Sequence, residues 1–362
     1  MALLIDNTDV GQLVSPAEVV DTLDAAYRDH ARKMDVCAPR LDLQSVENAR
    51  GEAYQLGIAL GLGSTGYACL RIKSDMVFQE TVDGRTRKQK YCVQPGTYMG
   101  LLLVFDMHDG ALRAIVHDGM IQKLRVGADS ALGVRYLARP DARVLGILGA
   151  GGMARAHVDT ITATRDLHQI RIHSPTRANR VALAEYARTE KGVEAVAVDD
   201  PEAVFNGADI VAGCTNAVGP VIPGRHLRPG MHVTCIGGTL DAEASAKVDV
   251  ALRFGTAPAP LGMKDWDFED ESLNFAVGGR KSASGTTRRF HDVPQSRRVM
   301  FAELLADPHR GRQDASQITF SERGNIHGVQ FAALAGLIYE RARDRGLGRT
   351  LDPGLFLQNI RN

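Results

Sequence analysis

A glycine-rich turn that joins an apolar run to helix-compatible sequence is the part of this chain best suited to chemistry. Gly149, Gly151 and Ala154 follow the apolar residues 144–148 in the pattern Gly-x-Gly-x-x-Ala. Gly149 permits a tight turn, Gly151 lets the backbone approach a pyrophosphate, and Ala154 is small enough for a helix to pack closely on a strand. Residues 170–173 form a second strand-like run about twenty residues later, as a βαβ unit requires. The spacing predicts a dinucleotide-binding turn made by Gly149, Gly151, Gly152, Met153 and Ala154.

The residues at the end of the second strand bear on the choice of cofactor. An NAD-binding enzyme commonly offers Asp or Glu to the ribose hydroxyls there. This chain instead has Ser174, Thr176 and Arg177, with Arg180 one turn further on. Hydroxyls and arginines in place of an acid favour a ribose 2′-phosphate, so NADP(H) is favoured and NAD(H) is possible. Because a doubly wound sheet binds ligands beyond the carboxyl ends of its strands, cofactor contacts are also predicted for Cys214, Thr215, Asn216 and Gly237.

After residue 143 the sequence alternates between apolar strand-like runs and helix-compatible segments. This alternation predicts an α/β fold with a Rossmann-type, doubly wound parallel sheet. Its expected strands cover residues 144–148, 170–173, 194–198, 210–214, 232–237 and 248–254. The segment 256–298 interrupts the alternation with an acidic run and then a Gly-, Ser- and Arg-rich run. We interpret this insertion as a solvated surface loop, with an active-site lid as the alternative.

The N-terminal part of the sequence has a different pattern. Ser15 and Glu18 form a capping box with proline at the first helical position, so an amphipathic helix is expected from residue 16. Residues 54–116 consist of short β-like runs separated by turn signals, which predicts an antiparallel sheet. Residues 326–345 have helical spacing and are followed by Gly346 as a stop, so a long helix is expected near the end.

A chain of 362 residues is more comfortable as two domains than as one. We expect an α+β substrate-binding and dimerisation domain over residues 1–125, joined by the C-terminal helix within 320–362. The Rossmann dinucleotide-binding domain is expected over residues 126–319, with the insertion at about 256–298 inside it.

Charge and composition exclude several classes of function. The chain has 43 basic and 43 acidic residues, which does not favour a nucleic acid or a membrane surface as partner. There is no run of about eighteen apolar residues and no secretion-signal pattern at the N-terminus, so a cytoplasmic protein is expected. The five cysteines are odd in number and widely spread, and no CxxC or HExxH pattern occurs. We therefore expect reduced thiols and no metal site.

Three segments, taken in order, resemble the ornithine cyclodeaminase/mu-crystallin family. They are residues 96–106, residues 123–131 and the Gly149 turn, and the likeness continues at 208–215, 227–233 and 317–320. Members of that family use NAD or NADP to oxidise amino acids, to reduce imines, or to cyclise and deaminate ornithine. The resemblance implies chemistry at a carbon–nitrogen bond beside a carboxylate, in a small amino acid or imine. It also implies a homodimer with the N-terminal sheet in the subunit contact.

The resemblance assigns roles to four cationic residues. Arg125 corresponds to the arginine that binds the substrate carboxylate, and Arg40 resembles the family's earlier carboxylate-binding arginine; a bidentate guanidinium both neutralises a carboxylate and fixes its plane. The family's active-site lysine corresponds to Arg71, with Lys73 two residues on. Strand alternation puts Arg71 and Lys73 on one face, so either could bind substrate and protonate or polarise its nitrogen. Lys73 would need burial or a neighbouring cation, such as Arg71, to lower its pKa toward neutrality.

Asp241 separates two enzyme hypotheses. A true cyclodeaminase resembling the family carries an aspartate in a Gly-Ala-Asp context after the fifth strand, where this chain has Thr239, with Asp241 close by. The departure favours an NAD(P)-dependent imine reductase or amino acid dehydrogenase over an ornithine-type cyclodeaminase in which Asp241 would engage the amine. A third hypothesis is a mu-crystallin-type protein that binds NADPH and a small ligand without turnover. The cationic set Arg40, Arg71, Lys73 and Arg125 favours catalysis over that hypothesis.

Overall fold

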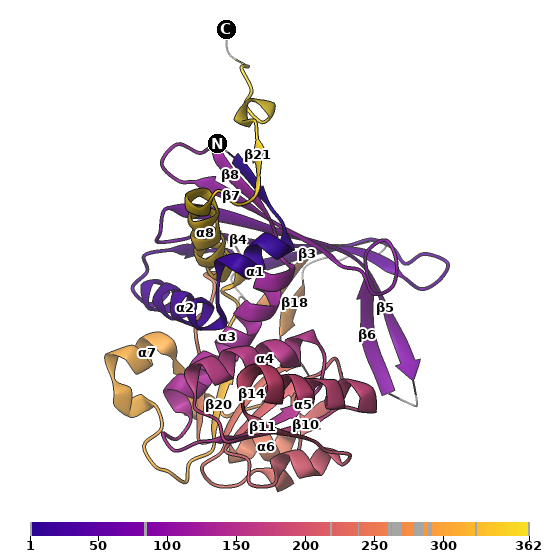
Figure 1. The fold of residues 1–362 in the computed structure, drawn as a ribbon, viewed down its shortest axis with the longest axis vertical. Helices are drawn as coiled ribbons and strands as arrows, with labels where there is room; N and C mark the ends of the chain where they lie inside the picture. The colour runs from indigo at the N-terminus through magenta and orange to yellow at the C-terminus, as the bar shows by residue number, and fades with distance from the viewer. Residues whose placement is uncertain are drawn as a thin grey trace.

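The computed structural model describes residues 2–82, 85–217, 219–237, 239–259, 262, 270–278, 285–288, 292–322 and 324–360. Two large sheets lie one above the other in Figure 1, and helix α3 (Gly119–Leu137) runs between them. A small parallel sheet joins β13 (Pro220–Ile222) to β15 (Thr239–Leu240). Helix α3 carries the chain from the first large sheet to the second.

The first sheet holds the N-terminal strands and the last strand of the chain. It has the order β18-β17-β3-β4-β5-β7-β8-β1-β21, with β2 beside β4 and β6 beside β5. Its strands are β1 (Ala2–Ile5), β2 (Val36–Cys37), β3 (Arg40–Gln44), β4 (Ala53–Leu62), β5 (Tyr67–Val82), β6 (Arg85–Tyr91), β7 (Met99–Asp106), β8 (Leu112–His117), β17 (Asp270–Val277), β18 (Gly285–Arg288) and β21 (Arg349–Leu351). From β3 to β8 the neighbours are antiparallel, as the β-like runs predict. β1 pairs in parallel with β8 and antiparallel with β21, so both ends of the described chain join one sheet.

The insertion is not a surface loop in its described part, and that prediction was wrong. β17 pairs in parallel with β3, and β18 pairs antiparallel with β17, so the insertion extends the first sheet. Backbone hydrogen bonds to an existing strand edge allow strands to form without an apolar sequence pattern, which is why composition misled the interpretation. Most of the acidic run and the Gly-, Ser- and Arg-rich run lies outside the described residues.

The second sheet is the predicted doubly wound parallel sheet. The strand pairings in the described part of this sheet are parallel, in the order β11-β10-β9-β12-β14-β20-β16-β19. Its strands are β9 (Val144–Leu148), β10 (Gln169–His173), β11 (Glu194–Ala197), β12 (Ile210–Cys214), β14 (His232–Gly237), β16 (Val250–Arg253), β19 (Arg298–Met300) and β20 (Thr319–Glu322). The strand order reverses between β9 and β12, where such a sheet binds a dinucleotide. The Rossmann-type fold is confirmed, although sequence reasoning missed β19 and β20.

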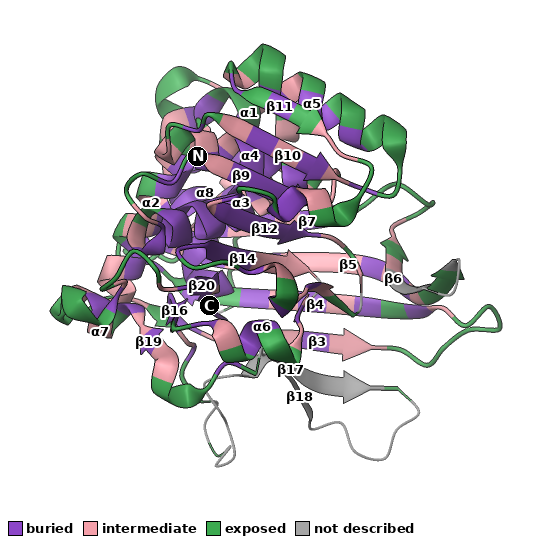
Figure 2. Ribbon diagram, turned by 90° about the horizontal axis from the view of Figure 1, so that it is seen from below, coloured by how far each residue is buried: buried purple, intermediate pink, exposed green. Residues whose placement is uncertain are grey.

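Helices cover both sheets. They are α1 (Asn7–Leu13), α2 (Pro16–Ala31), α3, α4 (Gly152–Thr164), α5 (Arg177–Lys191), α6 (Ala242–Lys247), α7 (Phe301–Ala306) and α8 (His327–Arg345). The predicted capping box of α2 is present, and α8 ends at Gly346 with a left-handed φ of 66°. Figure 2 shows that α8 and α3 are largely buried, whereas α5 is largely exposed. None of the helices in the described part of the chain is long and apolar enough to cross a membrane.

The close contact between α3 and α4 depends on a glycine. A Cβ at Gly127 would lie 2.6 Å from the carbonyl oxygen of Ala156 and 2.8 Å from the hydroxyl of Thr160. Any larger residue at this position would push the two helices apart. Gly127 therefore lets the helix that leaves the first sheet lie directly on the helix that follows the glycine turn.

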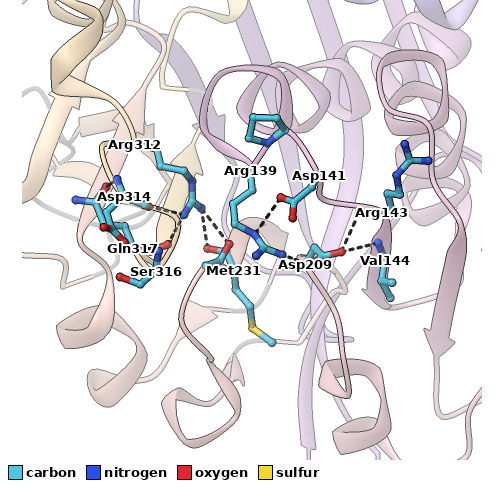
Figure 3. Close-up of polar contacts among 12 residues, drawn as sticks. Arg139, Asp141, Arg143, Val144, Asp209, Met231, Arg312, Asp314, Ser316 and Gln317 are labelled. Atoms are coloured by element: carbon cyan, nitrogen blue, oxygen red, sulfur yellow. Dashed lines mark hydrogen bonds and ion pairs between the residues drawn. The ribbon is translucent and has the colours of Figure 1, made fainter.

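A polar network closes the amino end of the parallel sheet, opposite the glycine turn (Figure 3). The Asp209 carboxylate accepts hydrogen bonds from the backbone N–H groups of Arg143 and Val144 at 2.8 and 3.0 Å and pairs with Arg139 at 2.5 Å. Arg312 donates to the carbonyl oxygens of Met231 and Gln317, among others. These bonds satisfy backbone groups at strand ends that would otherwise lack partners.

Candidate active site

The glycine turn lies at the carboxyl end of β9, beside β12. Gly149 has a φ of 118°, and a Cβ there would lie 2.1 Å from the carbonyl oxygen of Cys214. Only glycine fits this position. The N–H of Gly149 donates to the carbonyl of His173 at 2.7 Å, which fixes the turn against β10. Ala154 is fully buried in α4. The turn therefore has the backbone geometry that the spacing predicts.

The first turn of α4 suits an anion. A Cβ placed on Gly151 would meet no atom within 4 Å, and Gly151, as the N-cap, gives the helix no side-chain cap. The backbone N–H groups of Gly152 and Met153 belong to the positive end of this helix, where phosphates bind. The diphosphate of a nicotinamide dinucleotide fits these residues.

The end of β10 separates the two arginines that the sequence placed near the ribose. The guanidinium of Arg180 donates to the carbonyl oxygen of Ser174 at 2.7 Å and pairs with Asp199. Arg177 is exposed at the start of α5, and its neighbour Thr176 caps that helix without a side-chain hydrogen bond. Ser174 is buried. Of the two arginines, Arg180 is therefore held by contacts within the protein, and Arg177 is exposed.

The ends of β12 and β14 complete the cofactor crevice. A Cβ at Gly237 would lie 1.7 Å from the carbonyl oxygen of Thr215, so the segments after the two strands touch here. The hydroxyl of Thr215 accepts a hydrogen bond from the N–H of Ala217 at 3.1 Å, and Asn216 is exposed. Cys214 contacts the glycine turn through its backbone, and burial raises the pKa of its thiol well above the ordinary value. We expect Cys214 to shape the crevice rather than react.

Lys73 lies on the face of the first sheet that the helices cover, between two glycines. It pairs with Gly57 on β4 and with Gly100 on β7. A Cβ at Gly57 would lie 2.9 Å from Oδ1 of Asp42, and a Cβ at Gly100 would lie 2.2 Å from the carboxylate of Asp118. The missing side chains therefore make room for aspartates on both sides of Lys73.

Arg71 and Arg125 meet on one aromatic ring. Their guanidinium carbons lie 5.0 and 5.1 Å from the centroid of the Phe331 ring. Arg71 forms an ion pair with Asp118, with Nη2 2.6 Å from Oδ2. Arg125, on α3, donates to the amide oxygen of Gln330 at 2.7 Å. All of these side chains are buried, so the two arginines that the sequence put forward separately form one cluster.

Arg40 belongs to the same face. Its Nη2 lies 2.7 Å from Oδ1 of Asp42 and 3.3 Å from the Cβ position of Gly57, which pairs with Lys73. The insertion reaches this point, because Ser272 of β17 is the register partner of Arg40. The structure thus brings Arg40, Arg71, Lys73 and Arg125 together.

Lys73 has the perturbed acidity that a proton donor needs. Burial lowers its pKa to about 8, and the charge of Lys90 on β6 is the next cause, while its contact with Asp75 opposes the shift. Arg40 contributes a smaller lowering. The cation expected for this role was Arg71, and that part of the prediction was wrong: Arg71 pairs with Asp118, whereas Lys90 lies 3.9 Å from the carboxylate of Asp75.

Asp241 has the contacts of a structural residue. Its Oδ1 accepts hydrogen bonds from the N–H of Ala244 at 2.7 Å, as the N-cap of α6, and from the N–H of Gly224 at 2.9 Å. Both partners belong to the nucleotide-binding part of the chain. The role in amine binding that the cyclodeaminase hypothesis requires of Asp241 remains a prediction without a contact to support it.

Several residues of the site carried no signal in the sequence. Lys123 on α3 is one of them, since its Cδ lies 3.4 Å from the Cβ position of Gly152 at the start of α4. This contact joins the cofactor turn to the helix that carries Arg125. The others are Asp42, Asp75, Lys90, Asp118, Gln330 and Phe331. Strand alternation from Arg40 to Asp42 and from Lys73 to Asp75 could have marked two of them, whereas the contacts of the rest depend on packing between elements.

Metal ligands are absent from the described part of the chain. No three His, Cys, Asp or Glu side chains gather there in a way that could hold a metal ion. The five cysteines are free, and Cys37, Cys69 and Cys214 are buried.

A doubly wound parallel sheet with a glycine turn at the carboxyl end of β9 defines the class of Rossmann-type nucleotide-binding folds. The model of the ornithine cyclodeaminase/mu-crystallin family matches residues 76–255. The chain belongs to this family, which confirms the resemblance seen in the sequence.

Individual relatives extend the match over most of the chain. The Δ1-pyrroline-2-carboxylate reductase of Bacillus cereus is 21% identical over 97% of this chain and 99% of that protein. An uncharacterized cyclodeaminase of Sinorhizobium fredii is 29% identical over 69% of this chain and 72% of that protein. The fold matches the structure of Thermococcus litoralis Δ1-pyrroline-2-carboxylate reductase in complex with NADH and L-proline, with a TM-score of 0.74, 20% identity and coverage of 96% of this chain and 100% of that chain.

The acidity of Lys73 can be measured directly. We expect its ammonium group to titrate with a pKa of about 8. The titration can be monitored by NMR through the ε-carbon chemical shift of isotope-labelled lysine. Lys90→Gln should raise this pKa, because it removes a cation that disfavours the protonated form, and Asp75→Asn should lower it, because it removes the favourable partner.

The ε-carbon resonance of Lys73 is assigned from its absence in the Lys73→Gln protein. Lys247→Gln on α6 is the surface control, and it should leave the Lys73 resonance unchanged. A titration of Lys73 at its ordinary value, or the same midpoint in the Lys90→Gln and Asp75→Asn proteins, would contradict the electrostatic account.

Proposed function

We propose that this chain is an NAD(P)-dependent oxidoreductase that acts on the C–N bond of an imine or amino acid carrying an α-carboxylate. The observation that carries the proposal is the cationic cluster of the buried Arg71 and Arg125 and the half-buried Lys73, in which Arg125 belongs to the helix whose Lys123 contacts the glycine turn. Relatives named as reductases of Δ1-pyrroline-2-carboxylate act on a substrate of this chemistry.

Substrate binding and cofactor binding would belong to the parts of the chain that form the first and the second sheet, respectively. Residues 1–125, together with 320–362, would bind the substrate, and residues 126–319 would bind the cofactor. The contact of Lys123 with the Gly152 position supports this arrangement, because Lys123 and Arg125 belong to the same helix, α3, which leads from the first sheet to the second. The arginine proposed to bind the carboxylate would therefore lie on the helix that joins the substrate-binding part to the cofactor-binding part.

Each cationic residue has a distinct part in the reaction. Arg125 and Arg40 bind the carboxylate, and a guanidinium fixes the plane of such a group as well as its charge. Lys73 donates a proton to the substrate nitrogen during imine reduction and takes it back during amine oxidation, with Arg71 polarising the same region. The nicotinamide, when bound, supplies or accepts the hydride. Burial of the cluster strengthens these charge interactions.

The contacts of Asp241 weigh against cyclodeamination as the main activity. Its carboxylate caps α6 and holds Gly224, and these bonds would have to break before it could bind a substrate amine. Because one relative is named as a cyclodeaminase, cyclodeamination is retained as the alternative activity to be tested.

A panel of imines tests the proposal. We expect absorbance loss from NADPH or NADH with cyclic ketimines, or with 2-oxo acids plus ammonia or methylamine. Arg125→Lys should lower kcat/KM roughly tenfold to hundredfold, since it replaces charge-assisted, bidentate hydrogen bonds with a point charge. Arg135→Lys, on the same helix but half-exposed and paired with Asp21, is the matched control.

Two results would contradict the reductase proposal. Ammonia release from ornithine without net cofactor change would indicate a cyclodeaminase. Cofactor binding with no turnover of any panel member or of ornithine would indicate a ligand-binding protein.

We further propose NADP(H) as the preferred cofactor and a homodimer as the working form. The exposed Arg177 and Thr176 at the start of α5, with no acidic residue after β10, support the phosphate-bearing cofactor. Five free thiols and a nicotinamide cofactor also suit a cytoplasmic location.

Cofactor choice is tested by fluorescence titration. Arg177→Ala should weaken NADPH binding roughly tenfold to hundredfold, because a charge-assisted bond to the 2′-phosphate is lost, and should leave NADH binding unchanged. Arg188→Ala, near the other end of α5, is the control. Equal effects on both cofactors would argue against a phosphate contact.

The outer face of the first sheet supports the dimer. Tyr54, Leu60 and Leu62 on β4 and Met99 on β7 are 41%, 37%, 41% and 46% exposed. On β4 they alternate with buried residues that face the helices, so they form one apolar surface on the opposite side. An exposed apolar surface of this kind commonly marks a protein–protein contact.

Sedimentation velocity tests the dimer. The unmodified protein should sediment as a dimer, and Leu60→Glu should shift it toward monomer by placing a charge in the contact. Val181→Glu on α5, where the valine is 45% exposed, introduces the same charge away from the sheet and should have no effect. A monomeric unmodified protein would overturn this part of the proposal.

A further inference from the structure

We propose that Gln330 is a positioning residue that holds the Arg125 guanidinium in the orientation that binds the substrate carboxylate. The inference rests on the proposed function, because it takes Arg125 as the carboxylate-binding residue. Gln330 lies on α8 and is fully buried, and its Oε1 accepts a hydrogen bond from Nη1 of Arg125 at 2.7 Å.

The direction of the Gln330 amide is set by its other end. Its Nε2 donates to both carboxylate oxygens of Asp129 at 3.1 Å and also contacts the hydroxyl of Tyr27. An ionised carboxylate only accepts hydrogen bonds, so the NH₂ side of the amide must face Asp129. The oxygen side then faces Arg125, and a flipped amide would oppose like groups at both ends.

Tyr27 and Asp129 are themselves fixed. The Tyr27 hydroxyl donates to Oδ1 of Asp129, and its ring stacks on Phe254 at 5.1 Å. Burial, followed by the charge of Asp129, raises the pKa of Tyr27 well above its ordinary value, so the hydroxyl keeps its proton. Asp129 lies one helical turn after Arg125 on α3 and presents the same face, which lets a single amide bridge the two side chains.

Three helices therefore determine where Arg125 points. Tyr27 comes from α2, Asp129 and Arg125 from α3, and Gln330 from α8. The next residue on α8, Phe331, supplies the ring that both Arg71 and Arg125 contact. A buried polar network is stable only when its members are satisfied together, so changing the amide should disturb the guanidinium.

The decisive variant is Gln330→Glu. It has nearly the same shape, but it places a negative charge between Arg125 and Asp129. The new carboxylate would pair with Arg125 and compete with the substrate carboxylate, and it would repel Asp129. Gln330→Met removes the hydrogen bonds of the amide to Arg125, Asp129 and Tyr27 without adding charge. Tyr27→Phe removes only the hydroxyl contact.

Steady-state kinetics with Δ1-pyrroline-2-carboxylate as the probe substrate separates binding from turnover. We expect Gln330→Glu to raise KM roughly 10-fold to 100-fold, with a smaller change in kcat. Cofactor Kd should stay close to that of the unmodified protein, whereas Tm should fall, because the new carboxylate repels the buried Asp129. Tyr27→Phe should raise KM in the same direction but more weakly. Gln313→Glu, at an exposed position, is the matched control.

Arg125→Lys, measured in parallel, distinguishes failure of the inference from failure of the proposed function. If Arg125→Lys raises KM and Gln330→Glu does not, the positioning role of Gln330 is overturned and the function stands. The role is also overturned if KM, kcat and cofactor Kd all change to a similar extent in Gln330→Glu, since that pattern reports a general structural defect.

If the unmodified protein does not turn over the probe, crystal structures decide. A guanidinium of Arg125 that has moved in Gln330→Glu relative to the unmodified protein supports the inference. An unmoved guanidinium overturns it.

Discussion

The centre of this molecule depends on the contact of two positively charged side chains, Arg71 and Arg125, with the buried ring of Phe331. The guanidinium carbons of Arg71 and Arg125 lie 5.0 and 5.1 Å from the centroid of the Phe331 ring, and both side chains are buried. Burying a charge is unfavourable unless partners replace its water, and Asp118 and Gln330 supply those partners. Removing one partner of a buried ion pair costs about 3–5 kcal/mol. The cluster can form only when β5, α3 and α8 meet, so it fixes the arrangement of these three elements.

The same elements connect the two sheets. α3 leads from β8 of the first sheet to β9 of the second, and α8 leads from β20 of the second sheet back to β21 of the first. Each crossing helix carries residues of the site: Lys123, Arg125 and Asp129 on α3, and Gln330 and Phe331 on α8. A shift of one sheet relative to the other would therefore change the contacts between the residues of the cationic cluster. This coupling supports the proposal that a substrate bound at one sheet is presented to a cofactor bound at the other.

The local features of this arrangement could be predicted from the sequence, but little of the pairing between distant strands could. The Gly149 turn, the strands on either side of it and the common face of Arg71 and Lys73 follow from spacing alone, because each depends on neighbours in the chain. The place of β20 between β14 and β16, and of β17 beside β3, depends on backbone pairing between distant segments that leaves no periodic pattern. The partners Asp118 of Arg71 and Gln330 of Arg125 were hidden for the same reason, because they are distant in the sequence. Lys90, instead of Arg71, is the neighbouring cation that lowers the pKa of Lys73.

The central claim is that the cationic cluster presents an imine to the nicotinamide for hydride transfer. Its most direct test is an incubation with cofactor deuterated at the transferring carbon and the imine identified as substrate, followed by mass spectrometry of the product. The account predicts one deuterium at the α-carbon of the amino acid, and loss of that label transfer in Arg125→Lys at subsaturating substrate. A product that forms without deuterium, with the label still on the cofactor, would contradict it.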